Sequence, residues 1–106
     1  MQKYLLAYHG GKQFESKEEG QAHMQAWMAW MNGLGDAVVD AGMPVGPSVT
    51  VSSEGVSNDG GPNPLSGITV VQAESIEAAI EMAKACPHIN IGGSIEVAPD
   101  MMMSMN

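Results

Sequence analysis

The sequence predicts one small α+β domain with the element order β-α-β-β-α-β. Stretches of alternating and helical hydrophobic periodicity follow one another as strand, helix, strand, strand, helix, strand. Two serines, Ser16 and Ser75, stand where the helical patterns begin, and a serine hydroxyl is a favoured helix cap. The 106 residues are the length of one domain.

The first half contributes a strand, a long helix and a second strand. In the strand Lys3–His9, Tyr4, Leu6 and Tyr8 share one face, and Leu5 and Ala7 share the other. The capping box Ser16-Lys17-Glu18-Glu19 opens a helix that we expect to run to about Ala41, before Gly42 and Pro44. Two stripes are expected to face the sheet, one large and one small: Trp27, Met31, Leu34, Val38, Ala41; and Ala22, Ala26, Ala29, Gly33, Ala37.

The segment Met43–Val51 is expected to form an edge strand, because prolines cannot donate to a sheet ladder. The segment Ser52–Ser66 is rich in Gly, Ser, Asn, Asp and Pro, and is predicted to be a loop.

The second half adds strand Gly67–Ala73 and a helix capped by Ser75, which Pro87 stops. The buried face of this helix is predicted to hold Ile76, Ala79, Ile80 and Ala83. The last strand is predicted over Ile91–Val97, with a bulge at Gly92-Gly93 and an end at Pro99.

Right-handed crossovers place both helices on the same face of such a sheet. The opposite face is expected to be apolar, because the first strand is apolar on both sides apart from its tyrosine hydroxyls. The strand Gly67–Ala73 likewise offers Ile68, Val70 and Gln72 on one face and Thr69, Val71 and Ala73 on the other. A bare apolar face is unusual in a monomer. We therefore expect a homodimer that pairs through its sheets. The alternative is that the loop Ser52–Ser66 folds over this face.

Composition excludes several classes of partner. Four basic against twelve acidic residues give a formal charge of −8, which argues against nucleic acid and against anionic membrane surfaces. The lone Cys86 allows no internal disulfide and fits a reducing compartment. No signal peptide and no membrane span are recognisable, so a soluble, cytoplasmic protein is expected.

Several motifs resemble those of the YCII-related (DGPF-domain) family. They are Ser75-Ile76-Glu77-Ala78-Ala79, Ala85-Cys86-Pro87, Gly92-Gly93-Ser94-Ile95-Glu96-Val97 and Asp59-Gly60-Gly61-Pro62. The resemblance implies a ferredoxin-like fold with a four-stranded antiparallel sheet, assembled as a dimeric α+β barrel. It would cover residues 1–99 and leave a loose tail, residues 100–106.

The resemblance also suggests where chemistry could lie. A catalytic His/Asp pair has been proposed for some family members, with the histidine early in the first helix, and His23 holds that place here. Cys86 stands where one branch of the family carries an aspartate, so Asp59 of the glycine-rich loop is the candidate partner.

The candidate site comprises His23 and Asp59 as catalytic residues, with Trp27, Trp30 and His88 as ligand-binding residues. Each has a structural alternative: a histidine bonded to backbone, a core tryptophan, or an aspartate that bonds its own turn. The three histidines show no short metal-binding spacing, so no metal site is expected. No cofactor is expected either.

Three functions fit these features. The first is a dimer that binds a small molecule between the sheet and the first helix. The second is a small-molecule enzyme in which His23 is a general acid or base. The third is an accessory dimer that acts on a protein partner.

Overall fold

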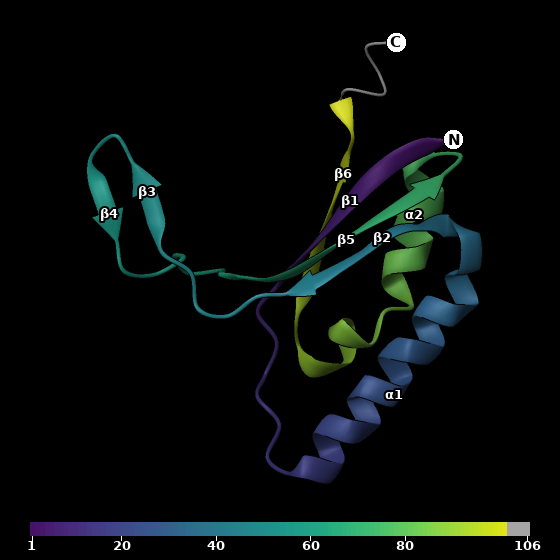
Figure 1. The fold of residues 1–106 in the computed structure, drawn as a ribbon, viewed down its shortest axis with the longest axis horizontal. Coiled ribbons are helices and arrows are strands. Elements are labelled where there is room, and N and C mark those ends of the chain that lie inside the picture. Colours follow the sequence, from purple (N-terminus) through teal and green to yellow (C-terminus); the bar gives the residue numbers. More distant parts are fainter. Residues whose placement is uncertain (102–106) are drawn as a thin grey trace.

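A four-stranded sheet forms the body of the molecule, and two helices lie against one of its faces (Figure 1). The computed structural model describes residues 1–101. The elements in chain order are β1 (Gln2–His9), α1 (Lys17–Leu34), the 3-10 turn η1 (Gly35–Ala37), β2 (Val38–Pro44), β3 (Thr50–Ser52), β4 (Gly55–Ser57), β5 (Leu65–Ala73), α2 (Ile76–Lys84), the 3-10 turn η2 (Pro87–Ile91) and β6 (Ser94–Pro99). The sheet order is β2-β5-β1-β6, with every neighbouring pair antiparallel. This confirms the predicted α+β, ferredoxin-like β-α-β-β-α-β fold.

Strand β1 is central in the sheet and has one buried and one open side. Tyr4, Leu6 and Tyr8 share one face, as predicted, and this face is buried against the helices. Leu5 points to the open side, where it lies opposite Val70 of β5. The core on the buried side also draws on both helices, on β5 and on the residue before η2: Trp30, Val71, Ala73, Ala79, Ala83 and Cys86. Both helices therefore cover the same sheet face, as the crossover argument predicted.

Serine hydroxyls cap both helices, which confirms the two predicted starts. Ser16 Oγ accepts a hydrogen bond from the Glu19 backbone N–H at 3.1 Å. Ser75 Oγ accepts one from the Ala78 backbone N–H at 3.2 Å. Each bond satisfies a donor that the first helical turn would otherwise leave unpaired.

The first helix is shorter than predicted, and the expected end at Ala41 is wrong. It stops at Leu34 because Gly35 has a φ of 55°, and the Gly35 N–H bonds back to the Met31 carbonyl. The β-branched Val38 and Val39 then start β2, so the second strand begins before the predicted range Met43–Val51 and overlaps it only at Met43 and Pro44.

Gly42 therefore has a role other than the predicted helix cap. It lies in β2 with a φ of 75°, at an irregularity of the pairing with β5 between Asp40 and Met43. A Cβ at this position would overlap the carbonyl oxygen of Ile68. A glycine is needed here for close approach of two strands.

The last strand also differs from the prediction, because the Gly92-Gly93 pair precedes it instead of forming a bulge. Gly92 has a φ of 80° and ends η2, and β6 then runs from Ser94 to Pro99. A proline at the end of β6 is tolerated because β6 is an edge strand.

The predicted loop Ser52–Ser66 contains part of a small hairpin. Strands β3 and β4 pair with each other, and all six of their residues are exposed. We call residues 45–64 the arm, since this segment extends away from the sheet (Figure 1). In this chain the segment leaves the open sheet face uncovered, contrary to the alternative considered above.

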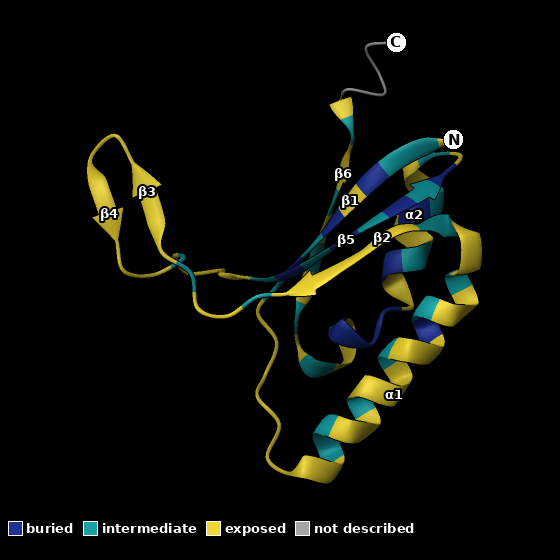
Figure 2. Cartoon of the chain, in the orientation of Figure 1, coloured by how far each residue is buried: buried dark blue, intermediate teal, exposed yellow. Residues whose placement is uncertain are grey.

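The predicted small stripe of α1 is largely exposed, and the predicted buried face of α2 is buried only in part. The small residues Ala22, Ala26, Ala29 and Gly33 are exposed. Trp27, Met31 and Leu34 of the predicted large stripe are partly buried and pack against the core, where Trp30 is buried. Figure 2 shows α1 as largely exposed, with intermediate and buried positions along it. Burial of Trp30 sets the rotation of α1 about its own axis, and this rotation turns the small residues away from the sheet. On α2, Ala79 and Ala83 are buried as predicted, but Ile76 and Ile80 are exposed.

The molecule is thin for its length. Its radius of gyration is 15.0 Å and its shortest extent is 18 Å, whereas a compact chain of about 100 residues has a radius near ~13 Å. Over residues 1–101, no helix is both long and apolar enough to cross a membrane. Most of the predicted tail, residues 102–106, lies outside the described residues.

Candidate functional site

A cavity of about 330 Å³ opens between the sheet and the N-terminal half of α1. Its walls come from the end of β1 and the following loop, from α1, from the adjoining ends of β2 and β5, and from η2. Most of the lining residues are apolar, with histidines and hydroxyl-bearing residues among them, and they include Tyr8, Lys12, Phe14, His23, Met24, Trp27, Met43, Pro44, Ser66, Ile68, Thr69, His88 and Ile91.

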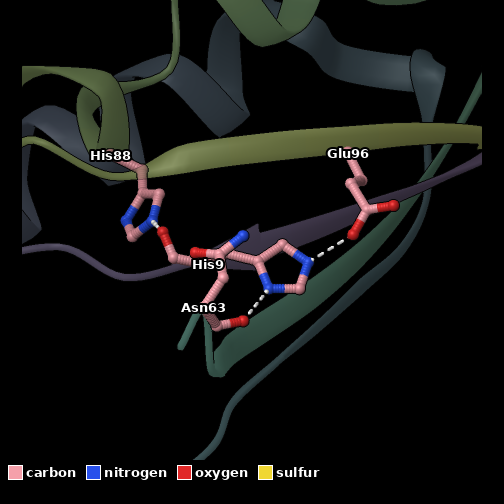
Figure 3. Close-up of polar contacts among 4 residues, drawn as sticks. All are labelled: His9, Asn63, His88 and Glu96. Atoms are coloured by element: carbon pink, nitrogen blue, oxygen red, sulfur yellow. Dashed lines mark hydrogen bonds and ion pairs between the residues drawn. The ribbon is translucent and has the colours of Figure 1, made fainter. Parts of the chain in front are cut away.

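His88 is the most constrained polar residue of the cavity. Its side chain is buried, and its Nε2 atom lies 2.9 Å from the main-chain oxygen of His9 (Figure 3). A carbonyl oxygen can only accept a hydrogen bond, so Nε2 carries the proton of the neutral ring. The ring also lies against Gly11 and Gly93, where a Cβ would collide with it. Both its orientation and its tautomer are therefore fixed by the fold.

His23 lies in the same cavity, on the sheet side of α1. Its ring packs between Phe14 and Trp27, with centroid separations of 5.0 and 5.8 Å. Burial lowers the pKa of the imidazole below its usual 6.5, and the nearby His88 lowers it further, because two imidazolium charges in one cavity would repel each other. The neutral ring is therefore favoured at pH 7. Within residues 1–101, no hydrogen bond or ion pair joins His23 to a carboxylate.

A chain of hydroxyls crosses the inner wall. Tyr8 Oη donates to Thr69 Oγ1 at 2.7 Å, and Thr69 Oγ1 donates to the Ala41 carbonyl at 3.1 Å. Burial raises the pKa of the Tyr8 phenol, so the hydroxyl stays protonated. The Tyr8 ring also contacts Trp27 and His88 edge to face. This polar chain was not anticipated, although the sequence did place Tyr8 on the same strand face as Tyr4 and Leu6.

The two tryptophans lie in different surroundings. Trp27 lines the cavity and is half-buried. Trp30 is buried in the core, where its indole N–H donates to the Met82 carbonyl at 3.0 Å. The structure thus brings His23, Trp27 and His88 together around one cavity and places Trp30 behind it.

Asp59 lies on the arm, outside the lining of this cavity. One carboxylate oxygen accepts from the Gly61 N–H at 3.1 Å and is 3.4 Å from the Ser57 hydroxyl. These bonds hold a turn, and Asp59 borders a second hollow with Val45, Gly46 and Pro64.

His9 is a residue whose contacts the sequence did not reveal. Its Nδ1 lies 3.0 Å from the Asn63 main-chain oxygen, and its Nε2 lies 2.7 Å from a carboxylate oxygen of Glu96 (Figure 3). The Glu96 contact is an ion pair by distance, without the angles of a hydrogen bond. His9 thus ties the arm and β6 to the end of β1. No local signal points to it, because its partners are 54 and 87 positions away in the chain.

Neither a metal site nor a reactive thiol is found in the part of the chain that the structure describes. No group of three or more His, Cys, Asp or Glu side chains is placed to hold an ion. Cys86 is buried, and burial raises the pKa of its thiol to about 11. The histidines of the cavity are thus its main acid–base groups.

Comparison with known proteins agrees with the fold and with the motifs in the second half of the chain. A search of curated proteins gave no match. The model of one family matches residues 1–99, which is nearly the whole chain. This protein belongs to the YCII-related domain family.

Proposed function

We propose that this protein binds a small molecule in the cavity between the sheet and α1. The observation that carries the proposal is the composition of the cavity wall: an apolar lining interrupted by two histidines, one of them locked in a single orientation. Ligand sites in proteins typically combine apolar walls with a few fixed polar groups, in volumes of roughly 300–1,000 Å³. The cavity lies at the lower end of that range, which suits a compact ligand.

A metabolite library screened by thermal shift tests this proposal. A ligand at 100 times its dissociation constant stabilises the folded state by about 2.7 kcal/mol, which is readily measured. Met24 and Met28 form a matched pair for a control. They are equally exposed on neighbouring turns of α1, but only Met24 lines the cavity.

Met24→Asp should weaken binding of an apolar ligand, because it places a charge at the cavity wall. Met28→Asp makes the same change of charge on the outer face and should bind as the wild type does. Equal effects of the two variants, or a library without ligands, would contradict the proposal.

We also propose that the protein acts as a homodimer whose subunits pair through the open sheet face. Leu5 of this face is exposed, and its neighbours Ala7, Ile68 and Val70 are only partly covered. The subunit is thin, because helices cover only one face of its sheet. The other apolar face is left in water, so a second subunit packed against it would remove that exposure. A two-fold pairing would cover this face on both copies.

The exposed valines of the arm are a second argument for pairing with another copy of the chain. Val51 is 74% exposed and Val56 is 65% exposed, in a hairpin that pairs only with itself in the described chain. An isolated two-stranded hairpin is marginally stable in water. A second copy of the chain gives these valines a surface to pack against. Size-exclusion chromatography with light scattering at micromolar concentration tests the dimer, and a monomeric mass would contradict it.

A second candidate function is catalysis with His23 as a general acid or base. It is favoured by one observation, the position of His23 in the same cavity as a second histidine, His88, where burial lowers the pKa of the His23 imidazole. Mass spectrometry of ligands found in the screen, after incubation with the protein, tests for conversion. His23→Asn should then slow conversion more than it weakens binding, whereas unchanged ligands would favour binding alone.

The cytoplasm is the compartment that we propose for this dimer. Cys86 is free and buried, and a chain with no disulfide suits a reducing environment. Detection of the protein in a secreted fraction would contradict this location.

A further inference from the structure

We propose that the cavity selects uncharged, planar apolar molecules that carry one N–H or O–H group, and that Nδ1 of His88 accepts this hydrogen bond. The inference rests on the proposed function, a small-molecule site, and adds the chemical class of the ligand and the atom that recognises it.

His88 offers a free acceptor. Its Nε2 proton is committed to the His9 carbonyl, so the Nδ1 of the neutral ring bears a lone pair. Within residues 1–101, no donor forms a hydrogen bond with Nδ1. The Nδ1–Cε1 edge faces Gly11, which lines the cavity, whereas the Nε2 edge faces Gly93, which does not. The acceptor is therefore on the cavity side of the ring.

Among the described residues, each hydroxyl group that lines the cavity already donates a hydrogen bond to another group of the protein. Tyr8 donates to Thr69, and Thr69 donates to the Ala41 carbonyl. Ser66 donates to the Gly10 carbonyl at 3.0 Å. These groups cannot donate to a ligand without giving up a bond inside the protein, and a buried polar group left unpaired is costly.

The charged groups near the cavity also disfavour an anion. Lys12, the cationic side chain of the lining, lies 3.7 Å from a carboxylate oxygen of Glu19. His23 is held neutral by its surroundings. A carboxylate ligand would lose its hydration in this cavity without gaining an unpaired cation, which is unfavourable. A neutral ligand with a donor group matches the acceptor at Nδ1 of His88.

Aromatic rings account for the planar shape. Phe14, His23, Trp27 and Tyr8 form a continuous series around the cavity, with neighbouring centroids 5.0 to 5.8 Å apart. A flat ligand can present its face or edge to several of these rings at once, and such contacts add to the burial of apolar area.

The tautomer of His88 gives a test that needs no ligand. Long-range proton–nitrogen NMR spectra of the wild type at neutral pH should show a proton on Nε2 and none on Nδ1. A ring protonated on Nδ1, or an equal mixture of the two tautomers, would overturn the inference.

Binding of three probes tests the ligand class. Indole has an N–H donor, 1-methylindole lacks it, and indole-2-carboxylate adds a negative charge. We expect indole to bind the dimer about tenfold more tightly than 1-methylindole, since an unmade hydrogen bond to a buried group costs on the order of 1 kcal/mol. The carboxylate should bind most weakly. Equal affinities, tightest binding of the carboxylate, or no binding of indole at millimolar concentration would overturn the inference.

Two variants of His88 connect this preference to Nδ1. In His88→Asn the side-chain oxygen can stand near Nδ1 and accept, whereas in His88→Gln the amide N–H can reach the His9 carbonyl but no acceptor faces the cavity. Indole preference should persist in His88→Asn and vanish in His88→Gln, with circular dichroism confirming that both fold. A preference that survives in His88→Gln would contradict the role of Nδ1.

A library screen separates failure of this inference from failure of the proposed function. Ligands that are mostly carboxylates, or that lack any donor, would support a small-molecule site and overturn the preference inferred for it. A screen without ligands would contradict both.

Discussion

The Nε2 atom of His88 lies 2.9 Å from the main-chain oxygen of His9, and this bond joins positions 79 residues apart. It attaches η2 to the end of the central strand β1, at the edge of the cavity. The side chain of His9 meanwhile contacts Glu96 and the Asn63 carbonyl. One residue of β1 therefore holds the cavity histidine through its backbone and the arm through its side chain.

The fit of His88 depends on the absence of a side chain at position 93. A Cβ at Gly93 would overlap the His88 ring, although Gly93 has no left-handed backbone. We expect Gly93→Ala to lower the free energy of unfolding by about 1–3 kcal/mol, the usual cost of overpacking. Urea denaturation measures this change. Gly33→Ala is the control, because Gly33 lies in α1 with open space around it, and alanine should stabilise that helix by up to ~1 kcal/mol. Equal effects at the two sites would contradict the steric argument.

The hydroxyl of Tyr8 should contribute to stability, and that of Tyr4 should not. Tyr8→Phe removes the donor to Thr69 and should destabilise the fold by roughly 0.5–1.5 kcal/mol, the net worth of a typical buried hydrogen bond. Tyr4 is equally buried on the same strand face, and no hydroxyl bond is found for it in the described chain. Tyr4→Phe is thus a matched control. Chemical denaturation measures the free energy of unfolding of both variants. A larger loss in Tyr4→Phe than in Tyr8→Phe would contradict the role given to the Tyr8 hydroxyl.

Local chemistry was enough to predict the order of the elements, both helix caps and the facing of β1. Caps depend on a few neighbouring residues, as at Ser16 and Ser75, and strand facing depends on a period of two. The handedness of crossovers then predicted that both helices cover the same sheet face.

The wrong predictions concern segments whose structure depends on contacts between distant parts of the chain. The helical pattern continues past Leu34, but pairing of Val38 with Val71 draws that segment into the sheet. Gly42 looked like a helix cap, yet its role depends on the Ile68 carbonyl of another strand. The acceptor edge of His88 could not be predicted at all, because its partner is the backbone of His9, and any residue has a carbonyl there.

The roles of the two tryptophans lead to a test of stability against binding. Trp30→Ala should cost about 3–5 kcal/mol, as expected for removal of a buried aromatic side chain. It also leaves the Met82 carbonyl without its donor. Trp27→Ala should cost less, since Trp27 is only half-buried, but it should weaken ligand binding more. Denaturation curves and binding titrations of the two variants measure both effects. A larger loss of stability in Trp27→Ala than in Trp30→Ala would contradict the separate roles of the two tryptophans.

The open face of the sheet predicts how a dimer can be broken. Leu5→Lys places a charge at the centre of that face, next to Val70. In a two-fold interface the change occurs twice, so loss of about 1.5–3 kcal/mol per leucine should raise the dissociation constant a hundredfold or more. Gln25→Lys makes a positive charge on the exposed face of α1 and serves as the control. Light scattering over a dilution series measures both. A Leu5→Lys variant that remains dimeric would place the interface elsewhere.

The surroundings of His23 predict a particular dependence of stability on pH. Its pKa in the folded chain is below the usual 6.5, so on acidification the unfolded chain takes up a proton before the folded chain does. Stability is therefore lost as the pH falls through about 6.5 towards the lower folded value. His23→Asn removes this term, so the wild type should lose more stability than the variant between about pH 7.5 and pH 5. Urea denaturation followed by tryptophan fluorescence measures the two slopes. The opposite sign, with the wild type gaining relative to the variant on acidification, would mean that a carboxylate pairs with His23 in solution. That outcome would favour the His/Asp pair over the neutral imidazole.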